Sequence, residues 1–241
     1  MPSLMKLHNK HGEQLDFSYH EGQKSDTLVI LGHGLTGNKD RPILVDLANS
    51  LSEAGYPCLR LSYSGNGESD GKFEEVTISK EVEDLCAVLD QVKSYKRIAY
   101  IGHSMGAAVG ALAAARDERI KVLVSLAGMV YTRDFIKRHF ANVIPGKGNM
   151  WNEEEHPYSE AFHNDLHSID HVLSAAKEVR APWLLFHGGL DDVVLPKDSH
   201  GLMDVIRDPK VLVELPNAHH SFENHNAELV DTVAAWLKRH L

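Results

Sequence analysis

Hydrophobic positions along the chain follow two alternating periods. Short apolar runs predict buried β-strands, and apolar residues three and four positions apart predict amphipathic helices. The expected strands cover residues 27–31, 57–61, 97–101, 121–126, 183–186 and 211–215. The expected helices cover residues 42–54, 79–92 (with Ser79 as its N-cap), 105–116, 202–206 and 227–241. Strands that alternate with helices in this way indicate an α/β fold, with a mostly parallel sheet covered on both faces.

Two segments depart from this alternation. Residues 4–20 alternate apolar and polar positions around a His-Gly-Glu turn, which predicts a β-hairpin. Residues 129–176 are rich in aromatic and histidine side chains and break the strand–helix rhythm. Because unstructured loops of that length are usually functional, we expect this segment to form a cap over the site. The core of the domain then comprises residues 1–128 and 177–241.

Composition narrows the class of protein. The chain has 241 residues, 43% of them hydrophobic and 24% charged, which is typical of a globular enzyme. A formal net charge of −9 argues against a surface that binds nucleic acid. We find no apolar run of about 18 residues that would span a membrane, and no signal-peptide layout at the N-terminus. Two cysteines are too few for a disulfide framework, so the expected location is cytoplasmic.

The strongest chemical motif is Gly-His-Ser-Met-Gly at residues 102–106. It matches the G-x-S-x-G elbow, in which a strand turns abruptly into a helix and presents a serine hydroxyl at the apex. An apolar strand leads into the motif and a helix of small residues leads out of it. Ser104 is therefore the expected nucleophile. The alternative is that Ser104 is an ordinary helix N-cap.

A serine hydroxyl needs a base to remove its proton and a carboxylate to orient that base. In folds with this elbow, the acid follows the serine along the chain and the histidine comes last. Asp191 and Asp192 follow the fifth expected strand, and His219 and His220 follow the sixth. We favour Asp191 and His220, because neighbouring side chains point in different directions and only one of each pair should reach its partner.

The oxyanion of acyl transfer needs preorganised donors, commonly two backbone N–H groups. One is expected from Met105, the residue after the nucleophile, and the other from Leu35, in the loop after the first parallel strand. His33 is expected to brace that loop by hydrogen bonding. His103 and His187, each beside a glycine turn, are expected to have structural roles as well.

Together these motifs resemble the α/β-hydrolase superfamily over nearly the whole chain. Residues 31–39 (Leu-Gly-His-Gly-Leu-Thr-Gly-Asn-Lys) and 65–73 (Gly-Asn-Gly-Glu-Ser-Asp-Gly-Lys-Phe) are similar to segments of bacterial cinnamoyl (feruloyl) esterases and related single-domain carboxylesterases. The resemblance implies the α/β-hydrolase fold and a carboxylesterase without a cofactor. It also implies a triad of Ser104, Asp191 and His220 that acts on a small-molecule ester.

Two rival functions stay open. A serine peptidase or a thioesterase would use the same machinery on an amide or a thioester bond. A non-catalytic protein that kept the fold for ligand binding would usually have lost a member of the triad, and all three residue types are present here. The sequence leaves the acyl and alcohol groups and the oligomeric state open.

The expected cap carries two further patterns. His163, His167 and His171 recur every four residues, so a continuous helix would align them on one face as candidate metal ligands. We favour a polar cap surface or a pocket rim over a metal site. The aromatic residues of the cap are expected to serve mainly in packing; they include Phe135, Phe140, Trp151 and Phe162.

Overall fold

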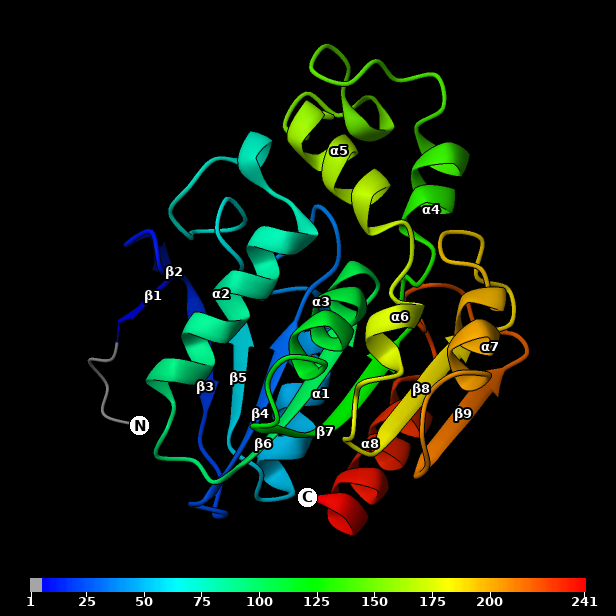
Figure 1. The fold of residues 1–241 in the computed structure, drawn as a ribbon. Coiled ribbons are helices and arrows are strands. Elements are labelled where there is room, and N and C mark those ends of the chain that lie inside the picture. Colours follow the sequence, from blue (N-terminus) through cyan, green and yellow to red (C-terminus); the bar gives the residue numbers. More distant parts are fainter. Residues whose placement is uncertain (1–5) are drawn as a thin grey trace.

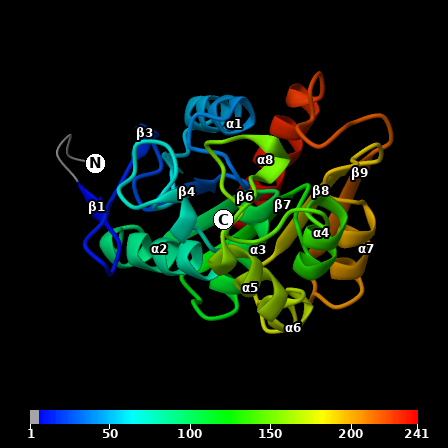
Figure 2. The ribbon, with the colours of Figure 1, turned by 90° about the horizontal axis from the view of Figure 1, so that it is seen from above.

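A computed structural model describes residues 6–241 and shows a seven-stranded sheet between two layers of helices (Figures 1 and 2). Only the first strand of the sheet order runs antiparallel to its neighbour. This confirms the predicted α/β architecture with a mostly parallel sheet. In spatial order the strands are β3 (Phe17–His20), β5 (Cys58–Leu61), β4 (Thr27–Gly32), β6 (Arg97–His103), β7 (Ile120–Leu126), β8 (Trp183–Gly188) and β9 (Lys210–Leu215).

The helices divide between the two faces of the sheet, as Figure 2 shows. One face is covered by α1 (Pro42–Glu53) and α8 (Asn226–His240). The other face is covered by α2 (Ile78–Gln91), α3 (Met105–Ala114), α6 (Leu173–Ala176) and α7 (Lys197–Met203). Among residues 6–241, no helix combines the length and the apolar character needed to cross a membrane.

The central strands are apolar on both faces because each face packs against helices. In β4, Leu28 and Ile30 belong to the core beneath α2 and α3. Val29 and Leu31 belong to the separate core beneath α1 and α8. All four side chains are fully buried. A continuous apolar run, rather than strict alternation, is what a strand buried on both faces requires.

The N-terminal hairpin predicted from residues 4–20 is present in the described part of the chain. β1 (Leu7–His8) pairs antiparallel with β2 (Gln14–Leu15), and Leu7 and Leu15 are buried. Leu4, which the prediction included, lies outside the described residues. The chain then enters β3 at the edge of the main sheet.

Two helix predictions were wrong in detail. The N-cap of α2 is Thr77, whose hydroxyl accepts the N–H of Lys80 at 3.0 Å, and Ser79 lies within the first turn instead. The segment 202–206 does not start a helix, because α7 has already begun at Lys197, directly after Pro196. Proline is well suited to a helix start, since its φ is fixed near the helical value. The apolar spacing of residues 202–206 predicted only the C-terminal end of α7, where Leu202 is buried.

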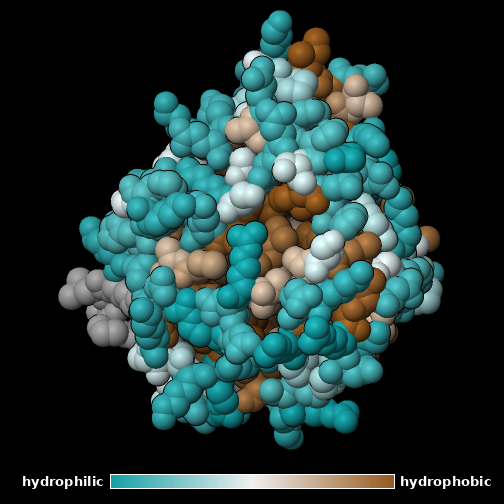
Figure 3. Space-filling model, in the orientation of Figure 1, coloured by the Kyte–Doolittle hydropathy of each residue, from teal (hydrophilic) through white to brown (hydrophobic). Residues whose placement is uncertain are grey.

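The segment expected to form a cap rises above the carboxyl ends of the strands (Figure 1). It contains α4 (Thr132–His139), the short 3-10 helix η2 (Met150–Asn152) and α5 (Glu160–Ile169). Its last helix, α6, packs instead against α3 and α7 of the core. A second 3-10 helix, η1 (Phe73–Glu75), lies beneath α5. In Figure 3 most of the visible face is hydrophilic, and hydrophobic side chains gather in its middle, below the cap.

Polar contacts tie the cap to the core at two points. The buried carboxylate of Asp198, in α7, accepts the backbone N–H groups of Val130 and Tyr131 at 2.8 and 3.1 Å, just before α4 begins. At the other side, Asp165 of α5 accepts the N–H and the hydroxyl of Ser79 at 3.1 and 2.5 Å. Asp198 therefore holds the chain where the cap begins, and Asp165 holds α5, the second α-helix of the cap, against the core.

Replacing Asp198 with alanine leaves two backbone N–H groups without an acceptor at the base of the cap. We expect the free energy of unfolding to fall by about 2 kcal/mol, because unsatisfied buried donors cost about 1–3 kcal/mol. Asp204→Ala is the matched control, since Asp204 is exposed near the same helix. Denaturant titration checks the difference, and equal stabilities of the two variants would contradict the assigned role of Asp198.

Candidate active site

Ser104 stands at the turn from β6 into α3, with φ 56° and ψ −118°. A positive φ is strained for any residue other than glycine, and such strain is concentrated at functional sites. Ser104 occupies the N-cap position of α3, yet its side chain makes no capping hydrogen bond. The N-cap alternative therefore has no contact to support it, and the hydroxyl faces a cavity instead.

Two glycines allow the loop after β4 to approach this turn closely. A Cβ atom on Gly106 would lie 2.5 Å from the carbonyl oxygen of His33, so the start of α3 packs directly on that loop. A Cβ atom on Gly34 would lie 2.8 Å from the Cβ of Ser104. The expected oxyanion loop and the expected nucleophile are thus in direct contact.

The backbone N–H groups of Leu35 and Met105 are oriented by these two elements. Leu35 follows Gly34 and lines the same cavity as Ser104, and Met105 is the first residue of α3. Neither N–H has a hydrogen-bond acceptor within residues 6–241. Both donors are available to an oxygen atom bound next to Ser104.

His33 holds the loop in place, as expected. Its Nδ1–H donates to the carbonyl oxygen of Gly34 at 2.8 Å, and its Nε2 accepts the N–H of Tyr63 at 3.1 Å. The side chain is completely buried, and burial lowers the pKa of His33 to about 4. The imidazole is therefore neutral at physiological pH and fixed in one tautomer.

The structure brings Asp191 and His220 together. The Nδ1–H of His220 donates to Oδ2 of Asp191 at 2.8 Å, and the carboxylate is buried. The neighbouring alternatives, Asp192 and His219, are exposed side chains. Sequence position alone could not distinguish Asp191 from Asp192 or His220 from His219. The directions of the side chains distinguish them.

Asp191 accepts several further hydrogen bonds. Its Oδ1 accepts the N–H groups of Val193 and Val194, both at 2.9 Å. The Nε2 of the buried His187 lies 3.3 Å from Oδ2. Burial alone would raise the pKa of Asp191, but the hydrogen bonds from His187, His220 and the backbone outweigh it and hold that pKa below its usual value. The carboxylate is therefore ionised whenever the protein is folded near neutral pH.

His187 and His103 both have structural contacts, as expected. His187 donates from Nε2 to the carbonyl of Val194 at 2.9 Å and accepts the hydroxyl of Ser199 at Nδ1, at 2.7 Å. His103 donates from Nε2 to the carbonyl oxygen of His220 at 3.1 Å, and the two rings lie 4.9 Å apart. Burial lowers the pKa of His103 to about 3. A neutral His103 thus contacts both the backbone and the ring of His220.

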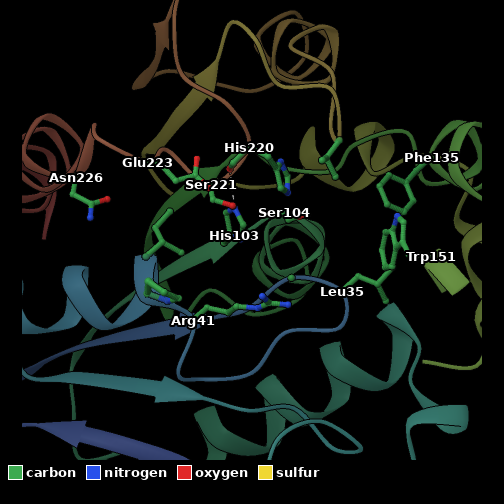
Figure 4. A pocket seen from close by; sticks show the side chains of 14 residues that line it. Leu35, Arg41, His103, Ser104, Phe135, Trp151, His220, Ser221, Glu223 and Asn226 are labelled. Carbon is green, nitrogen blue, oxygen red and sulfur yellow. Dashed lines mark hydrogen bonds between the residues drawn. The ribbon is translucent and has the colours of Figure 1, made fainter. Parts of the chain in front are cut away.

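Ser104 and His220 line one cavity of about 410 Å³ (Figure 4). Within residues 6–241, no hydrogen bond joins the hydroxyl of Ser104 to the imidazole of His220. Such bonds are commonly long in free enzymes and tighten when substrate binds. The hydrogen bond between Asp191 and His220 is therefore already formed, and the hydroxyl of Ser104 lies at the wall of the same cavity.

One end of the cavity is aromatic and apolar. Phe135 of α4 and Trp151 of η2 lie together at this end, with Leu35 below them (Figure 4). Trp151 also packs edge-on against Phe140, with ring centroids 5.0 Å apart. The expectation of mainly packing roles fits the buried Phe135, Phe140 and Phe162. Phe135 also lines the cavity, as does the exposed Trp151.

The other end is polar, and sequence reasoning missed it. Ser221, Glu223 and Asn226 line this end, and Arg41 runs along the wall below Ser104 (Figure 4). A positional signal was available for each of them. Arg41 follows the oxyanion loop by a few residues, and the other three lie within six positions after His220. Residues next to catalytic loops are the first candidates for substrate contacts.

The histidine pattern of the cap does not place all three side chains on one helical face: the rings of His163 and His167 lie 5.9 Å apart, but His171 is outside the helix. Helix α5 ends at Ile169, and Asp170 has φ 61°, so His171 leaves the helix axis. His163 is bonded through Nδ1 to the hydroxyl of Tyr158 at 2.8 Å. The part of the chain that the structure describes contains no group of three or more His, Cys, Asp or Glu side chains able to hold a metal ion.

Known proteins resemble this chain in sequence and in fold. A mitochondrial palmitoyl-protein thioesterase, ABHD10 of Homo sapiens, is 28% identical over 95% of this chain and 78% of its own length. The ferulic-acid-bound structure of Est1E from Butyrivibrio proteoclasticus superposes with a TM-score of 0.86 at 24% identity, covering 98% of this chain and 99% of that one. The mouse ABHD10 structure superposes with a TM-score of 0.82 at 22% identity, covering 98% of this chain and 99% of that one.

The structural likenesses show the fold, and the sequence match relates the chain to a palmitoyl-protein thioesterase. The family model described as the alpha/beta hydrolase fold matches residues 27–162, more than half of the chain. This range includes the loop of His33, the elbow of Ser104 and most of the cap. The chain belongs to the α/β-hydrolase fold family.

Proposed function

We propose that the protein is a serine hydrolase that cleaves carboxylic esters through an acyl-enzyme on Ser104. The observation that carries this proposal is the hydrogen bond from His220 to the buried Asp191, made at the wall of the cavity that also exposes the Ser104 hydroxyl. A strained serine, a base held by a carboxylate and free backbone donors are the components that acyl transfer requires.

In the first half-reaction, the oxygen of Ser104 bonds to the acyl carbon while His220 takes the hydroxyl proton. The tetrahedral intermediate then collapses, the bond to the alkoxide breaks, and His220 returns its proton to the leaving alcohol. In the second half-reaction, His220 deprotonates a water molecule that attacks the acyl carbon. The bond to the oxygen of Ser104 then breaks, His220 returns the proton to that oxygen, and the acid is released. Asp191 stays ionised throughout, so it stabilises the imidazolium that forms in each step.

The oxyanion of both intermediates lies next to the N–H groups of Leu35 and Met105. These donors need no reorganisation because His33 fixes the loop and α3 fixes Met105. Preorganised donors of this kind contribute about 2.7–4 kcal/mol of transition-state stabilisation each. The strain at Ser104 is maintained by the packing of α3 on the loop.

A second candidate is thioester hydrolysis with the same residues. It is favoured by the 28% identity to the human palmitoyl-protein thioesterase over 95% of this chain. A thiolate is a better leaving group than an alkoxide, so the machinery above would act on both bonds. The chain length and shape of the acyl group would then be set by the aromatic end of the cavity.

Ser104→Ala should abolish turnover of 4-nitrophenyl esters, with kcat reduced by at least about 10⁴-fold, because no other group can form the acyl-enzyme. A fluorophosphonate should label the wild-type protein at Ser104 and leave the variant unlabelled. Mass spectrometry of the labelled peptide checks the position. Near-normal turnover by the variant would refute the role of Ser104, and an unlabelled wild type would favour a non-catalytic binding protein.

Matched neighbours control for general damage to the two catalytic loops. His220→Gln and Asp191→Asn should lose most of the activity, whereas His219→Gln and Asp192→Asn should keep it, because these last two side chains are exposed. If the members of either pair were equally impaired, the assignment within that pair would be wrong.

The ester and thioester candidates are separated by a matched substrate pair. We expect the wild type to hydrolyse butyrate presented as an oxygen ester and as a thioester, with both rates lost in Ser104→Ala. An oxygen-ester kcat/KM within about tenfold of the thioester value supports esterase activity, since one acyl-enzyme serves both bonds. A thioester preference beyond about 10³-fold would make thioesterase the better description.

The pH dependence of stability tests whether His103, the histidine beside His220, is neutral in the folded protein. Its pKa is lowered by burial from 6.5 to about 3, so the folded state binds fewer protons than the unfolded state between these values. Stability is therefore lost as the pH falls below 6.5. In His103→Gln this loss should be smaller by up to about 1.4 kcal/mol per pH unit, measured by denaturant unfolding between about pH 6.5 and pH 4.5. Identical pH slopes for variant and wild type would contradict a neutral, buried His103.

A further inference from the structure

Arg41 is the only Lys or Arg among the described residues that line the cavity of Ser104. It precedes α1, and its side chain runs along the cavity wall below Ser104 (Figure 4). One of its nitrogens, Nη2, donates to the carbonyl oxygen of Thr36 at 3.0 Å. A guanidinium has five N–H donors in a planar fork, so most of its hydrogen-bonding capacity is still available.

No carboxylate within residues 6–241 forms an ion pair with Arg41. The adjacent Asp40 has other partners: it pairs with Lys39 at 2.7 Å and with Arg60 at 2.8 Å. Arg41 is an exposed residue at the cavity, so its guanidinium is accessible to a ligand, and it has no anionic partner among the described residues. Its charge reaches the two buried histidines beside the catalytic residues: burial is the main cause of the lowered pKa of His33 and His103, and Arg41 makes a smaller contribution to both.

A carboxylate is present in the cavity, but it is not the partner of Arg41. Glu223 is exposed at the polar end and makes no ion pair with Arg41 in the described part of the chain. Because Glu223 repels anions, a bound anion is favoured only where the guanidinium contacts it directly. The polar end should therefore favour ligands whose negative charge lies against Arg41 and away from Glu223.

We propose that Arg41 binds a carboxylate of the substrate, so that the preferred substrates are small esters with an apolar or aromatic group and a separate carboxylate. The apolar group would occupy the end formed by Leu35, Phe135 and Trp151. The carboxylate would receive the N–H donors of Arg41, a geometry that suits planar, two-pronged recognition. This inference rests on the proposed ester hydrolysis and adds the substrate class.

A purely structural role for Arg41 makes a different prediction. The bond to Thr36 braces the loop that carries Leu35, so loss of this brace would disturb the oxyanion donors. Such damage would slow the hydrolysis of all esters by the same factor. Loss of a carboxylate contact would slow only the hydrolysis of esters that carry the negative charge.

The test compares neutral and anionic esters of matched length. On the acyl side, the pair is 4-nitrophenyl pentanoate and the 4-nitrophenyl hemiester of glutarate. On the alcohol side, the pair is phenyl acetate and 4-carboxyphenyl acetate. In at least one pair, Arg41→Gln should lower kcat/KM for the anionic ester by about tenfold or more, as expected for a charge-assisted hydrogen bond. The neutral esters should change by less than about threefold.

Arg180→Gln is the matched control, because it removes the same charge from an exposed residue that pairs with Glu118 outside this cavity. It should leave the anionic-to-neutral ratio unchanged, whereas Glu223→Gln should raise it. The inference is overturned if Arg41→Gln slows neutral and anionic esters equally, changes neither, or matches Arg180→Gln.

Binding without turnover separates this inference from the proposed catalysis. In the Ser104→Ala background, monoethyl glutarate should bind more tightly than diethyl glutarate by NMR titration, and adding Arg41→Gln should remove the preference. If the wild type hydrolyses no ester but this preference is present, the proposed catalysis fails and the anion site stands. If esters are hydrolysed and the preference is absent, the anion site fails alone.

Discussion

The close approach of two backbone turns is the constraint on which the site depends. The first turn of α3 rests on the loop after β4 without an intervening side chain, because glycine occupies both facing positions. This contact keeps Ser104 at a positive φ and brings the N–H of Leu35 to the same cavity. A methyl group at either glycine would force the two turns apart and separate the hydroxyl from its neighbouring donors.

Buried neutral histidines supply much of the rigidity around this contact. His33, His103 and His187 each donate one ring N–H to a backbone carbonyl, and each lies at the carboxyl end of a strand or directly after it. A neutral imidazole can donate and accept at the same time, so it links two loops without adding a charge to the interior. The high histidine content of the chain is partly explained by this use as a polar connector.

The sequence was sufficient for the fold and for the residues at strand ends, because both follow from local patterns. Apolar runs bounded by glycine turns marked β4, β6 and β8. Ser104, Asp191 and His220 follow β6, β8 and β9, in that order. Details controlled by tertiary contacts were not predictable. Ser79 looks like a helix cap in isolation, but its hydroxyl is bonded to Asp165, 86 positions away in the chain. The polar wall formed by Arg41 and Glu223 arises only when α1 and the loop before α8 are brought together.

The hydrogen bonds of Asp198 and Asp165 to the two sides of the cap also bear on how proteins of this fold can change in sequence. Asp198 holds the backbone where the chain leaves the sheet, and Asp165 connects α5 to α2. Residues 140–158 lie between these anchors and include Trp151 at the cavity. Insertions or exchanges there can reshape the binding space while the reacting groups keep their positions. Relatives with equal chemistry can thus acquire different selectivities by changing one short stretch of chain.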